Sequence, residues 1–283
     1  MKYIECPRDA MQGLSEFIPT HLKAQYINTL LEVGFDTIDF GSFVSPKAIP
    51  QLRDTAEVLN QLKLDNTQSK LLAIIANKRG AEQAVQFNEI SYLGFPLSAS
   101  ETFQKRNTNK SIEEAFKLVE EVQHLCQKHN KTLVTYISMG FGNPYGDPYD
   151  AETIEKFTQT LVDLDVKIIS LADTIGVSNP SNIGFLYQTL IPRFPEVEFG
   201  AHLHSTPQTI TEKLRAAYEA GCRRFDGALR GFGGCPMAED DLVGNLATEV
   251  VLDFFAKNFE SIPVNQQKFK EAYALSGQVF PMH

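Results

Sequence analysis

The chain has 283 residues, of which 43% are hydrophobic and 22% are charged. This balance is typical of a globular protein with a large core, and it excludes disorder and collagen-like repetition. With 26 Lys and Arg against 35 Asp and Glu, the net charge of −9 argues against a broad surface for nucleic acid or for an anionic membrane.

Short β-branched or aliphatic runs alternate with amphipathic stretches along the whole chain. Ser111 opens a capping-box sequence, Asp150 and Pro180 are placed to begin two further helices, and Gly34 is placed to end one. Eight strands are predicted, near residues 2–6, 36–43, 71–76, 89–96, 132–139, 167–172, 196–203 and 223–229.

Eight strands separated by helices are typical of the α/β class and of a closed (β/α)8 TIM barrel. A doubly wound open sheet has the same alternation, but the chain has neither a G-x-G-x-x-G nor a P-loop sequence to support a nucleotide site. We therefore predict a single TIM-barrel domain over residues 1–283. The barrel is expected to span about residues 1–258 and a C-terminal helical extension about residues 259–283.

Active sites of TIM barrels lie at the C-terminal ends of the strands, so reactive side chains are expected to gather there. They do follow or end the predicted strands in this sequence. The residues concerned are Asp9, Asp39, Ser100, Glu101, Tyr136, Asp173, His202, His204 and Cys235.

His202 and His204 are two positions apart on a predicted strand, so both imidazoles are expected to point into the barrel mouth. An isolated H-x-H is more often a pair of hydrogen-bonded polar residues than a metal site. Asp9 and Asp173, at the ends of other strands, shift that balance toward a divalent cation. A mixed imidazole and carboxylate set favours Mg²⁺ or Mn²⁺, with Zn²⁺ as a further possibility.

Cys235 differs from the other three cysteines because it lies in the glycine-rich segment Gly231–Pro236. Cys6, Cys126 and Cys222 lie in predicted strands or on an apolar helix face and are expected to be buried, inert thiols. Glycines allow a backbone to bend over a ligand, so Cys235 is a candidate for proton transfer, with a structural turn cysteine as the alternative.

Arg8 and a cluster of basic residues after the fourth strand are candidates for anion binding. Arg8 offers a planar donor fork to a carboxylate or an enolate oxygen, or else forms an ion pair with Asp39 or Asp173. Lys105 and Arg106 lie in a basic segment over residues 104–110 that we interpret as a loop. This loop either holds the phosphates of an extended substrate or is a solvated surface.

Hydropathy, cysteine spacing and the C-terminal extension predict a cytoplasmic homo-oligomer without a membrane partner. The longest apolar run, Leu71–Ala76, is too short for a membrane span, and the N-terminus carries no signal-peptide core. Four cysteines without CxxC spacing fit a reducing compartment. A dimer or higher homo-oligomer is predicted because apolar residues of the extension are candidates to cover an interface, namely Phe269, Tyr273, Leu275 and Phe280.

Seven segments match one family pattern in order along almost the whole chain. They are Pro7–Gln12, Ile38–Lys47, Ala99–Glu101, Ser170–Gly176, Ala201–His204, Gly233–Pro236 and Gly244–Glu249. Together they resemble the 3-hydroxy-3-methylglutaryl-CoA lyase family, within the metal-dependent lyases and acyl-CoA condensing enzymes on TIM barrels. The Ser-Phe-Val-Ser-Pro-Lys and Gly-Gly-Cys-Pro stretches are the specific ones, whereas Arg-Asp and H-x-H are shared with the wider group.

The resemblance implies retro-Claisen cleavage of a 3-hydroxyacyl-CoA to acetyl-CoA and a 3-keto acid, acetoacetate in the family's usual reaction. It implies the metal ligands Asp9, His202, His204 and Asn245, and catalytic roles for Arg8, Asp173 and Cys235. The general base is left open among His202, Asp39 and Asp173. Substrate contacts are expected from Gln12, Ser100, Tyr136, Lys105 and Arg106.

This sequence departs from the family pattern at the predicted mouth. Asp39 stands where the family usually has Glu, Ala10 where it has Gly, and Ser205 where it has Asp. These differences bear on the acyl group more than on the metal or the reaction type. Two rival interpretations are a related aldolase or Claisen-condensing synthase of the isopropylmalate or homocitrate type, and a metal-binding barrel without catalytic activity.

Overall fold

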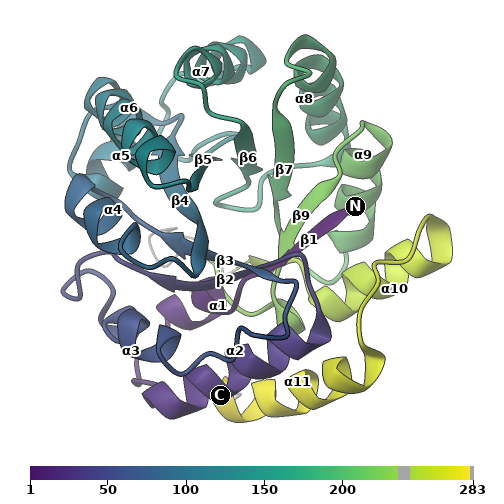
Figure 1. The fold of residues 1–283 in the computed structure, drawn as a ribbon. Coiled ribbons are helices and arrows are strands. Elements are labelled where there is room, and N and C mark those ends of the chain that lie inside the picture. The colour runs from purple at the N-terminus through teal and green to yellow at the C-terminus, as the bar shows by residue number, and fades with distance from the viewer. Residues whose placement is uncertain (235–242, 281–283) are drawn as a thin grey trace.

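Eight parallel strands close into a barrel in the computed structural model, which describes residues 1–234 and 243–280 (Figure 1). The barrel closes where β9 pairs with β1, placing Arg224 beside Lys2 and Gly227 beside Glu5. The predicted TIM barrel is thereby confirmed. Its strands are β1 (Lys2–Glu5), β2 (Thr37–Ser42), β3 (Lys70–Ile74), β4 (Ile90–Ser98), β5 (Thr132–Ser138), β6 (Ile168–Ala172), β7 (Glu198–His202) and β9 (Arg224–Gly227).

Helices cover the outside of the barrel, and three of them begin at the residues that the sequence predicted, namely Ser111, Asp150 and Pro180. Ser111 and Glu114 form a reciprocal capping box, Asp150 accepts from Thr153 N, and Gly34 ends its helix with φ +88°. The helices after the strands are α2 (Thr20–Val33), α3 (Thr55–Leu59), α4 (Lys78–Ala84), α6 (Ile112–Lys128), α7 (Ala151–Asp163), α8 (Pro180–Arg193), α9 (Ile210–Glu219) and α10 (Thr248–Asn258).

Short elements above the strand ends shape the mouth of the barrel. They are α1 (Pro7–Gln12), the 3-10 turns η1 (Pro50–Leu52) and η2 (Leu229–Gly231), α5 (Glu101–Thr108), and a two-stranded antiparallel sheet of β8 (His204–Ser205) and β10 (Gly244–Asn245). The predicted seventh strand, residues 196–203, was too long at its end, because the chain leaves the barrel after His202 and His204 pairs with Asn245 in the small sheet. The basic segment 104–110, interpreted as a loop, was also wrong in part, since it continues α5 to Thr108.

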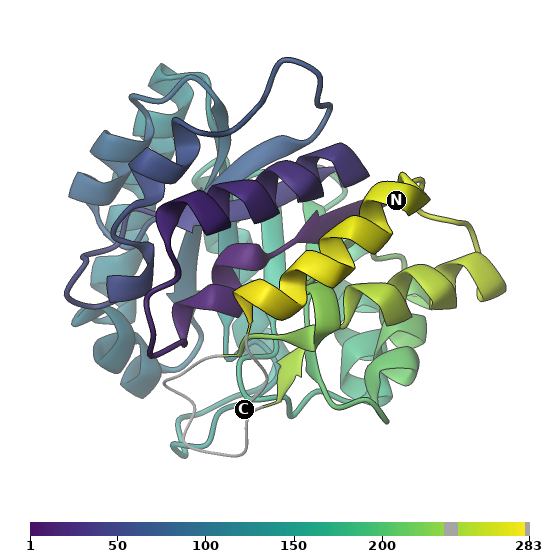
Figure 2. The ribbon, with the colours of Figure 1, turned by 90° about the horizontal axis from the view of Figure 1, so that it is seen from below.

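The C-terminal helix α11 (Gln266–Val279) packs against α2 of the same chain (Figure 2). Phe280 is 1% exposed and meets the Tyr26 ring edge-on at 5.6 Å. Leu275 is also buried in this core. These two residues, which the sequence offered for a subunit interface, are therefore covered by their own chain, and the homo-oligomer stays a prediction.

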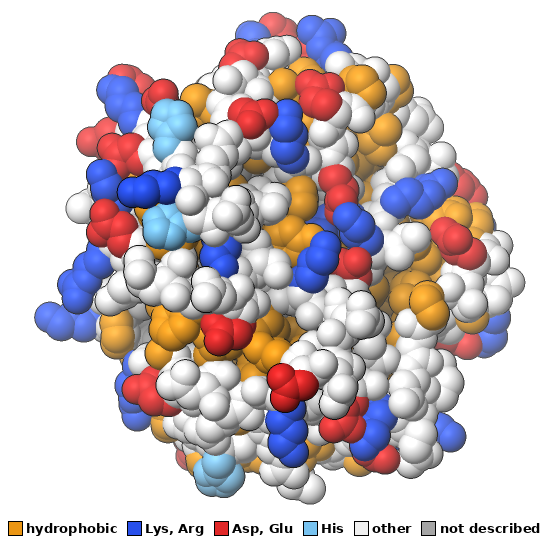
Figure 3. Space-filling view, in the orientation of Figure 1, with side chains coloured by type: hydrophobic (Ala, Val, Ile, Leu, Met, Phe, Trp, Pro, Cys, Tyr) orange, Lys and Arg blue, Asp and Glu red, His pale blue; other side chains and the backbone are white. Residues whose placement is uncertain are grey.

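Charged side chains lie on the outer surface, whereas three cysteines lie in the interior. On the face shown in Figure 3, acidic and basic side chains are interspersed. Within the described residues, no helix combines the length and apolar character needed to cross a bilayer. Cys6, Cys126 and Cys222 are buried free thiols, as predicted.

Candidate active site

The short helix α1 places Arg8 and Asp9 at the mouth of the barrel directly after β1. Pro7 occupies its first turn, where the missing N–H costs no helical hydrogen bond. Arg8 and Asp9 are 7% and 5% exposed, so both charges need partners within the protein. The first turn of α1 thus brings a buried cation and a buried anion to the end of β1.

The Asp9 carboxylate is held by three side chains. Its Oδ1 accepts from Arg8 Nη1 at 2.9 Å and from Gln12 Nε2 at 2.8 Å, and its Oδ2 accepts from Asn245 Nδ2 at 2.7 Å. Burial alone raises the pKa of Asp9, but Arg8 and the two nearby imidazoles outweigh burial and leave that pKa below its ordinary value. Asp9 is therefore an ionised, oriented carboxylate.

His202 and His204 face Asp9 from β7 and β8. Ligand atoms of the three residues lie within 4.8 Å of one another. His202 Nδ1 contacts Asp226 Oδ2 at 3.2 Å and His204 Nδ1 contacts the Thr174 carbonyl at 3.1 Å, so each ring keeps Nε2 for another partner. A carboxylate or carbonyl behind each imidazole is the usual support of a metal ligand.

The unused nitrogen of His204 tests whether this group fits a metal ion. Among the described residues, His204 Nε2 is a buried atom without a hydrogen-bond partner. Burial, with repulsion from His202, lowers the pKa of His204 to about 4, so its ring is neutral at pH 7. A neutral imidazole with a free lone pair beside an ionised carboxylate fits a divalent cation.

Asn245 completes this side of the mouth from β10. Its amide nitrogen donates to Asp9 Oδ2 at 2.7 Å and to the Phe232 carbonyl at 2.9 Å. Both hydrogens of the amide are then used, which leaves the side-chain oxygen as the atom available to an ion. Asn245, which only the family resemblance implied as a metal ligand, therefore lies against Asp9.

Arg8 and Asp39 form a buried, two-pronged ion pair. Arg8 Nη2 and Nε donate to Asp39 Oδ2 at 2.5 Å and 3.0 Å, while Nη1 also donates to Gln12 Oε1 at 2.9 Å. Burial raises the pKa of Asp39 to about 6, although Arg8 opposes the shift. Asp39 lies inside β2 rather than at its end, and it binds the edge of the guanidinium formed by Nε and Nη2.

A cavity of about 440 Å³ opens onto these groups. Of the predicted substrate contacts, Gln12, Tyr136 and Arg106 line it. Ser100 instead caps α5 and donates to Asp147 Oδ2 at 2.5 Å, and Lys105 is exposed and pairs with Glu101 at 2.9 Å. The remaining lining is largely apolar and includes Val44, Ile49, Ile74, Ala76, Pro96 and Phe103.

Sequence and structure comparisons agree on the relatives of this barrel. The model of the family described as HMGL-like matches residues 5–275. The chain belongs to this HMGL-like family. A hydroxymethylglutaryl-CoA lyase of Bacillus subtilis is 35% identical over 248 residues, which cover 87% of this chain and 81% of the relative. The mitochondrial hydroxymethylglutaryl-CoA lyase of Macaca fascicularis is 33% identical over 94% of this chain and 81% of the relative.

A solved structure of an HMG-CoA lyase from Acinetobacter baumannii, in complex with coenzyme A and 3-methylmalate, has the same fold as this HMGL-like chain. Its TM-score is 0.91 at 30% sequence identity, with 98% of this chain and 90% of that chain covered. The similarity therefore extends over the barrel and over the elements at its mouth.

Two further residues implied by the family pattern lie away from the cavity or outside the described residues. Asp173 accepts from Lys213 Nζ at 2.9 Å and from Ser178 Oγ at 2.5 Å, so its carboxylate is turned toward α9. Of the three groups considered as bases, His202 lines the cavity, whereas Asp39 binds Arg8 and Asp173 binds Lys213. Cys235 lies outside the described residues, and the catalytic roles of Asp173 and Cys235 stay predictions.

Asp226 is a site residue that the sequence reading missed. It lies on β9 inside the barrel, fully buried, and holds His202 Nδ1. Burial lowers the pKa of His202, but the hydrogen bond and the charge of Asp226 outweigh burial, so this pKa is raised. A charged residue in the middle of the predicted strand 223–229 was the available signal, because a strand inside a barrel accepts a charge only with a partner.

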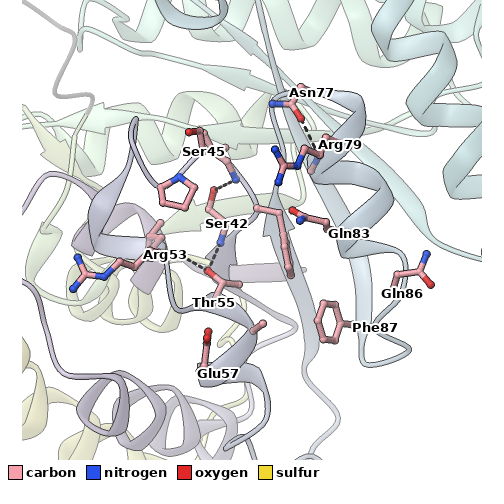
Figure 4. A pocket seen from close by; sticks show the side chains of 16 residues that line it. Ser42, Ser45, Arg53, Thr55, Glu57, Asn77, Arg79, Gln83, Gln86 and Phe87 are labelled. Carbon is pink, nitrogen blue, oxygen red and sulfur yellow. Dashed lines mark hydrogen bonds between the residues drawn. The ribbon is translucent and has the colours of Figure 1, made fainter.

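A second cavity, of about 570 Å³, lies between the segment after β2 and the start of α4 (Figure 4). Val44 lines both this cavity and the one at the barrel mouth. Asn77 accepts from Gly80 N at 2.9 Å, and a Cβ at Gly80 would lie 2.5 Å from the Phe43 carbonyl. The wall between the two cavities is thus fixed by close backbone packing against α4.

Proposed function

We propose that this protein is a divalent-metal-dependent lyase that cleaves 3-hydroxy-3-methylglutaryl-CoA to acetyl-CoA and acetoacetate. The observation that carries the proposal is the group of Asp9, His202 and His204 beside an arginine at the mouth of the barrel, with one imidazole nitrogen that has no partner among residues 1–234 and 243–280. Membership of the HMGL-like family supplies the reaction class.

The metal ligands in this proposal are Asp9, His202, His204 and Asn245. Mg²⁺ or Mn²⁺ is the favoured ion because the donors are oxygen and imidazole nitrogen without a thiolate, and Zn²⁺ is the alternative. When bound, a divalent ion polarises the substrate hydroxyl and carboxylate and lowers the pKa of that hydroxyl. Asp226 and the Thr174 carbonyl hold Nδ1 of the two imidazoles, so Nε2 of each ring is the atom that would bind the ion.

Cleavage requires that a general base take the hydroxyl proton and that the C2–C3 bond break, with its electron pair remaining on the acetyl-CoA fragment. The product of this step is the enolate of acetyl-CoA, and the new carbonyl belongs to acetoacetate. Protonation of the enolate carbon completes acetyl-CoA, and Cys235 is proposed to supply or relay that proton. The protein's task is to stabilise negative charge on the enolate oxygen.

Arg8 is placed for that task by the way its donors are used. Nε and one N–H of Nη2 bind Asp39, and the two hydrogens of Nη1 bind Asp9 and Gln12. Within the described residues, this arrangement keeps the second N–H of Nη2 for the enolate oxygen. Asp39 is proposed to hold the guanidinium in this orientation.

The acyl-CoA chain is proposed to leave the barrel past Arg106, which lines the cavity and lies over the Tyr145 ring at 4.7 Å. Arg106 and Lys105, on neighbouring positions of α5, offer positive charge to the phosphates of coenzyme A. Tyr136 and Gln12 are proposed to contact the acyl group, and Ser100 to orient α5 through its cap.

Purified protein incubated with 3-hydroxy-3-methylglutaryl-CoA and Mg²⁺ or Mn²⁺ tests the proposal. Acetyl-CoA release is expected, with loss of release in EDTA and recovery after the metal is added back. His204→Ala, which removes a proposed metal ligand, is expected to lose acetyl-CoA release. His124→Ala, an exposed change on α6, is its control. No acetyl-CoA from this thioester or its close acyl homologues would overturn the proposal, and condensation of acetyl-CoA with a 2-oxo acid would favour the synthase.

A further inference from the structure

The turn after β9 contains an arginine in a backbone conformation that arginine rarely adopts. Arg230 has φ +62° and ψ 8°, in the left-handed region that favours glycine. Its backbone N–H donates to Glu249 Oε2 at 3.0 Å. A residue stays in this region only when its surroundings hold it there.

The side chain of Arg230 is anchored in the C-terminal helix α11. Nε donates to Ser276 Oγ at 2.8 Å and Nη2 donates to the Tyr273 carbonyl at 3.1 Å. The guanidinium also lies over the Tyr273 ring at 4.1 Å. Three contacts from one helix therefore fix both the direction of this side chain and the backbone from which it comes.

The residues that follow Arg230 lie against the proposed metal ligands. The Phe232 carbonyl accepts from Asn245 Nδ2 at 2.9 Å, and the Phe232 ring packs on Phe280 at the end of α11 at 4.9 Å. A Cβ at Gly233 would lie 2.5 Å from Asn245 Nδ2 and 3.0 Å from Asp9 Oδ2. The backbone at Phe232 and Gly233 therefore decides where Asn245 and Asp9 sit.

We propose that Arg230 is a positioning residue, through which α11 holds the backbone of residues 231–233 against Asn245 and Asp9. Loss of the anchor lets residue 230 return to negative φ, which moves the Phe232 carbonyl away from the Asn245 amide. Asn245 then loses the bond that turns its oxygen toward the ion. This inference rests on the proposed function only in taking Asp9 and Asn245 as metal ligands.

Two substitutions separate the side-chain anchor from the backbone conformation. Arg230→Ala removes the anchor and disfavours positive φ, whereas Arg230→Gly removes the anchor and tolerates positive φ. Arg230→Ala is expected to raise the Mn²⁺ dissociation constant about 10-fold, as loss of support behind metal ligands does. Arg230→Gly is expected to raise it less, about threefold, because glycine tolerates the positive φ and only the anchor is lost. Arg230→Lys keeps one donor and is expected to recover part of the affinity.

The measurements are Mn²⁺ binding by isothermal titration calorimetry and, separately, kcat and KM for 3-hydroxy-3-methylglutaryl-CoA, all on the full chain well below its unfolding temperature. For the alanine variant we expect kcat to fall about 10-fold with KM within about twofold, because the acyl-CoA contacts lie elsewhere. The matched control is Arg215→Ala, because Arg215 also joins two helices, through Asn258 Oδ1 at 2.9 Å and the Phe254 ring at 5.3 Å.

Wild-type Mn²⁺ affinity in Arg230→Ala or Arg230→Gly would overturn the inference, as would an equal loss in Arg215→Ala. If Arg230→Ala does not fold, Ser276→Ala decides, with a smaller loss of Mn²⁺ affinity expected and an unchanged value overturning the inference. Mn²⁺ binding that depends on Arg230 in a protein without lyase activity would remove the proposed function and keep the inference.

Discussion

The interior of the barrel has two unlike halves. The apolar half comes from strands β3 to β6 and consists of Leu72, Ile74, Tyr92, Val134, Tyr136 and Ile168. The polar half comes from the strands and turns on the other side and includes Arg8, Asp9, Asp39, His202 and Asp226. Inward positions on parallel strands are equivalent in geometry, so the difference is one of sequence alone.

The contrast shows how buried charges are kept in a TIM barrel. Each of these five residues is bonded to another of them: Arg8 to Asp9 and Asp39, and His202 to Asp226. The apolar half faces them across a cavity and keeps the effective dielectric low, which strengthens each electrostatic contact. Substitutions in the polar half should therefore act on chemistry and ion binding, and those in the apolar half, apart from Tyr136 with its proposed contact to the acyl group, should act on packing.

The largest effect is expected at Arg8, because it bonds two carboxylates and is proposed to donate to the enolate oxygen. Arg8→Met should lower kcat about 10³-fold, since an oxyanion donor is lost and two buried carboxylates lose their partner. Arg8→Lys keeps the charge without the fork and should recover part of this loss. Acetyl-CoA release measures both variants, and a decrease below about tenfold in Arg8→Met would place the enolate elsewhere.

His204→Ala should have the next largest effect, on ion binding rather than on the fold. Removing one of the proposed ligands should raise the Mn²⁺ dissociation constant more than about 100-fold, beyond what loss of outer support causes. The metal-free variant should still fold, but its unfolding free energy should fall by about 1–3 kcal/mol, because the buried ring also loses its Nδ1 contact with the Thr174 carbonyl. Calorimetry with His124→Ala as control checks this, and unchanged affinity would contradict the ligand assignment.

The pH dependence of stability should report Asp39. Its folded-state pKa is about 6, above the ordinary value of 3.8, because of burial. The contribution of Asp39 to the free energy of unfolding is therefore fully present below pH 3.8. It is lost as the pH rises through about 6, by an amount on the order of 3 kcal/mol. Turnover should run the opposite way, since the ionised carboxylate orients Arg8.

Chemical unfolding in EDTA between pH 4 and 8 measures this difference between wild type and Asp39→Asn. The stability difference should fall as the pH rises and then level off above about pH 7. Asp163→Asn, at an exposed position of α7, provides the control. A difference that does not vary with pH would show that Asp39 is ionised throughout the range.

The apolar pattern was enough to predict the strands, and local spacing was enough for part of the site. Alternation of buried runs with amphipathic stretches placed all eight barrel strands, since burial on both faces leaves a strong signal. Arg8 with Asp9, and His202 with His204, are close in the chain and therefore visible as motifs. The end of β7 at His202 was missed because Leu203 is as apolar as the strand before it.

Contacts between distant residues explain what the sequence did not reveal. Asp226 meets His202 across 24 positions, and Lys213 meets Asp173 across 40. No periodicity encodes such pairings, which depend on how neighbouring strands and helices pack in the folded barrel. The basic charge of residues 104–110 led to the prediction of a loop. Two local signals indicated the start of a helix instead: Ser100 as an N-cap and the Glu101–Lys105 spacing.

The smallest effect is expected in the apolar half, where Ile74→Val tests whether that half acts only by packing. Ile74 lines the cavity and belongs to the apolar cluster, so deletion of one methylene should cost about 0.5–1.5 kcal/mol of unfolding free energy. Mn²⁺ affinity and kcat should stay within about twofold of wild type, because no hydrogen bond or charge changes. Denaturant unfolding and the acetyl-CoA assay measure the two quantities. A tenfold loss of kcat at unchanged Mn²⁺ affinity would mean that the apolar half orients the substrate, and the division between chemistry and packing would then fail at the cavity wall.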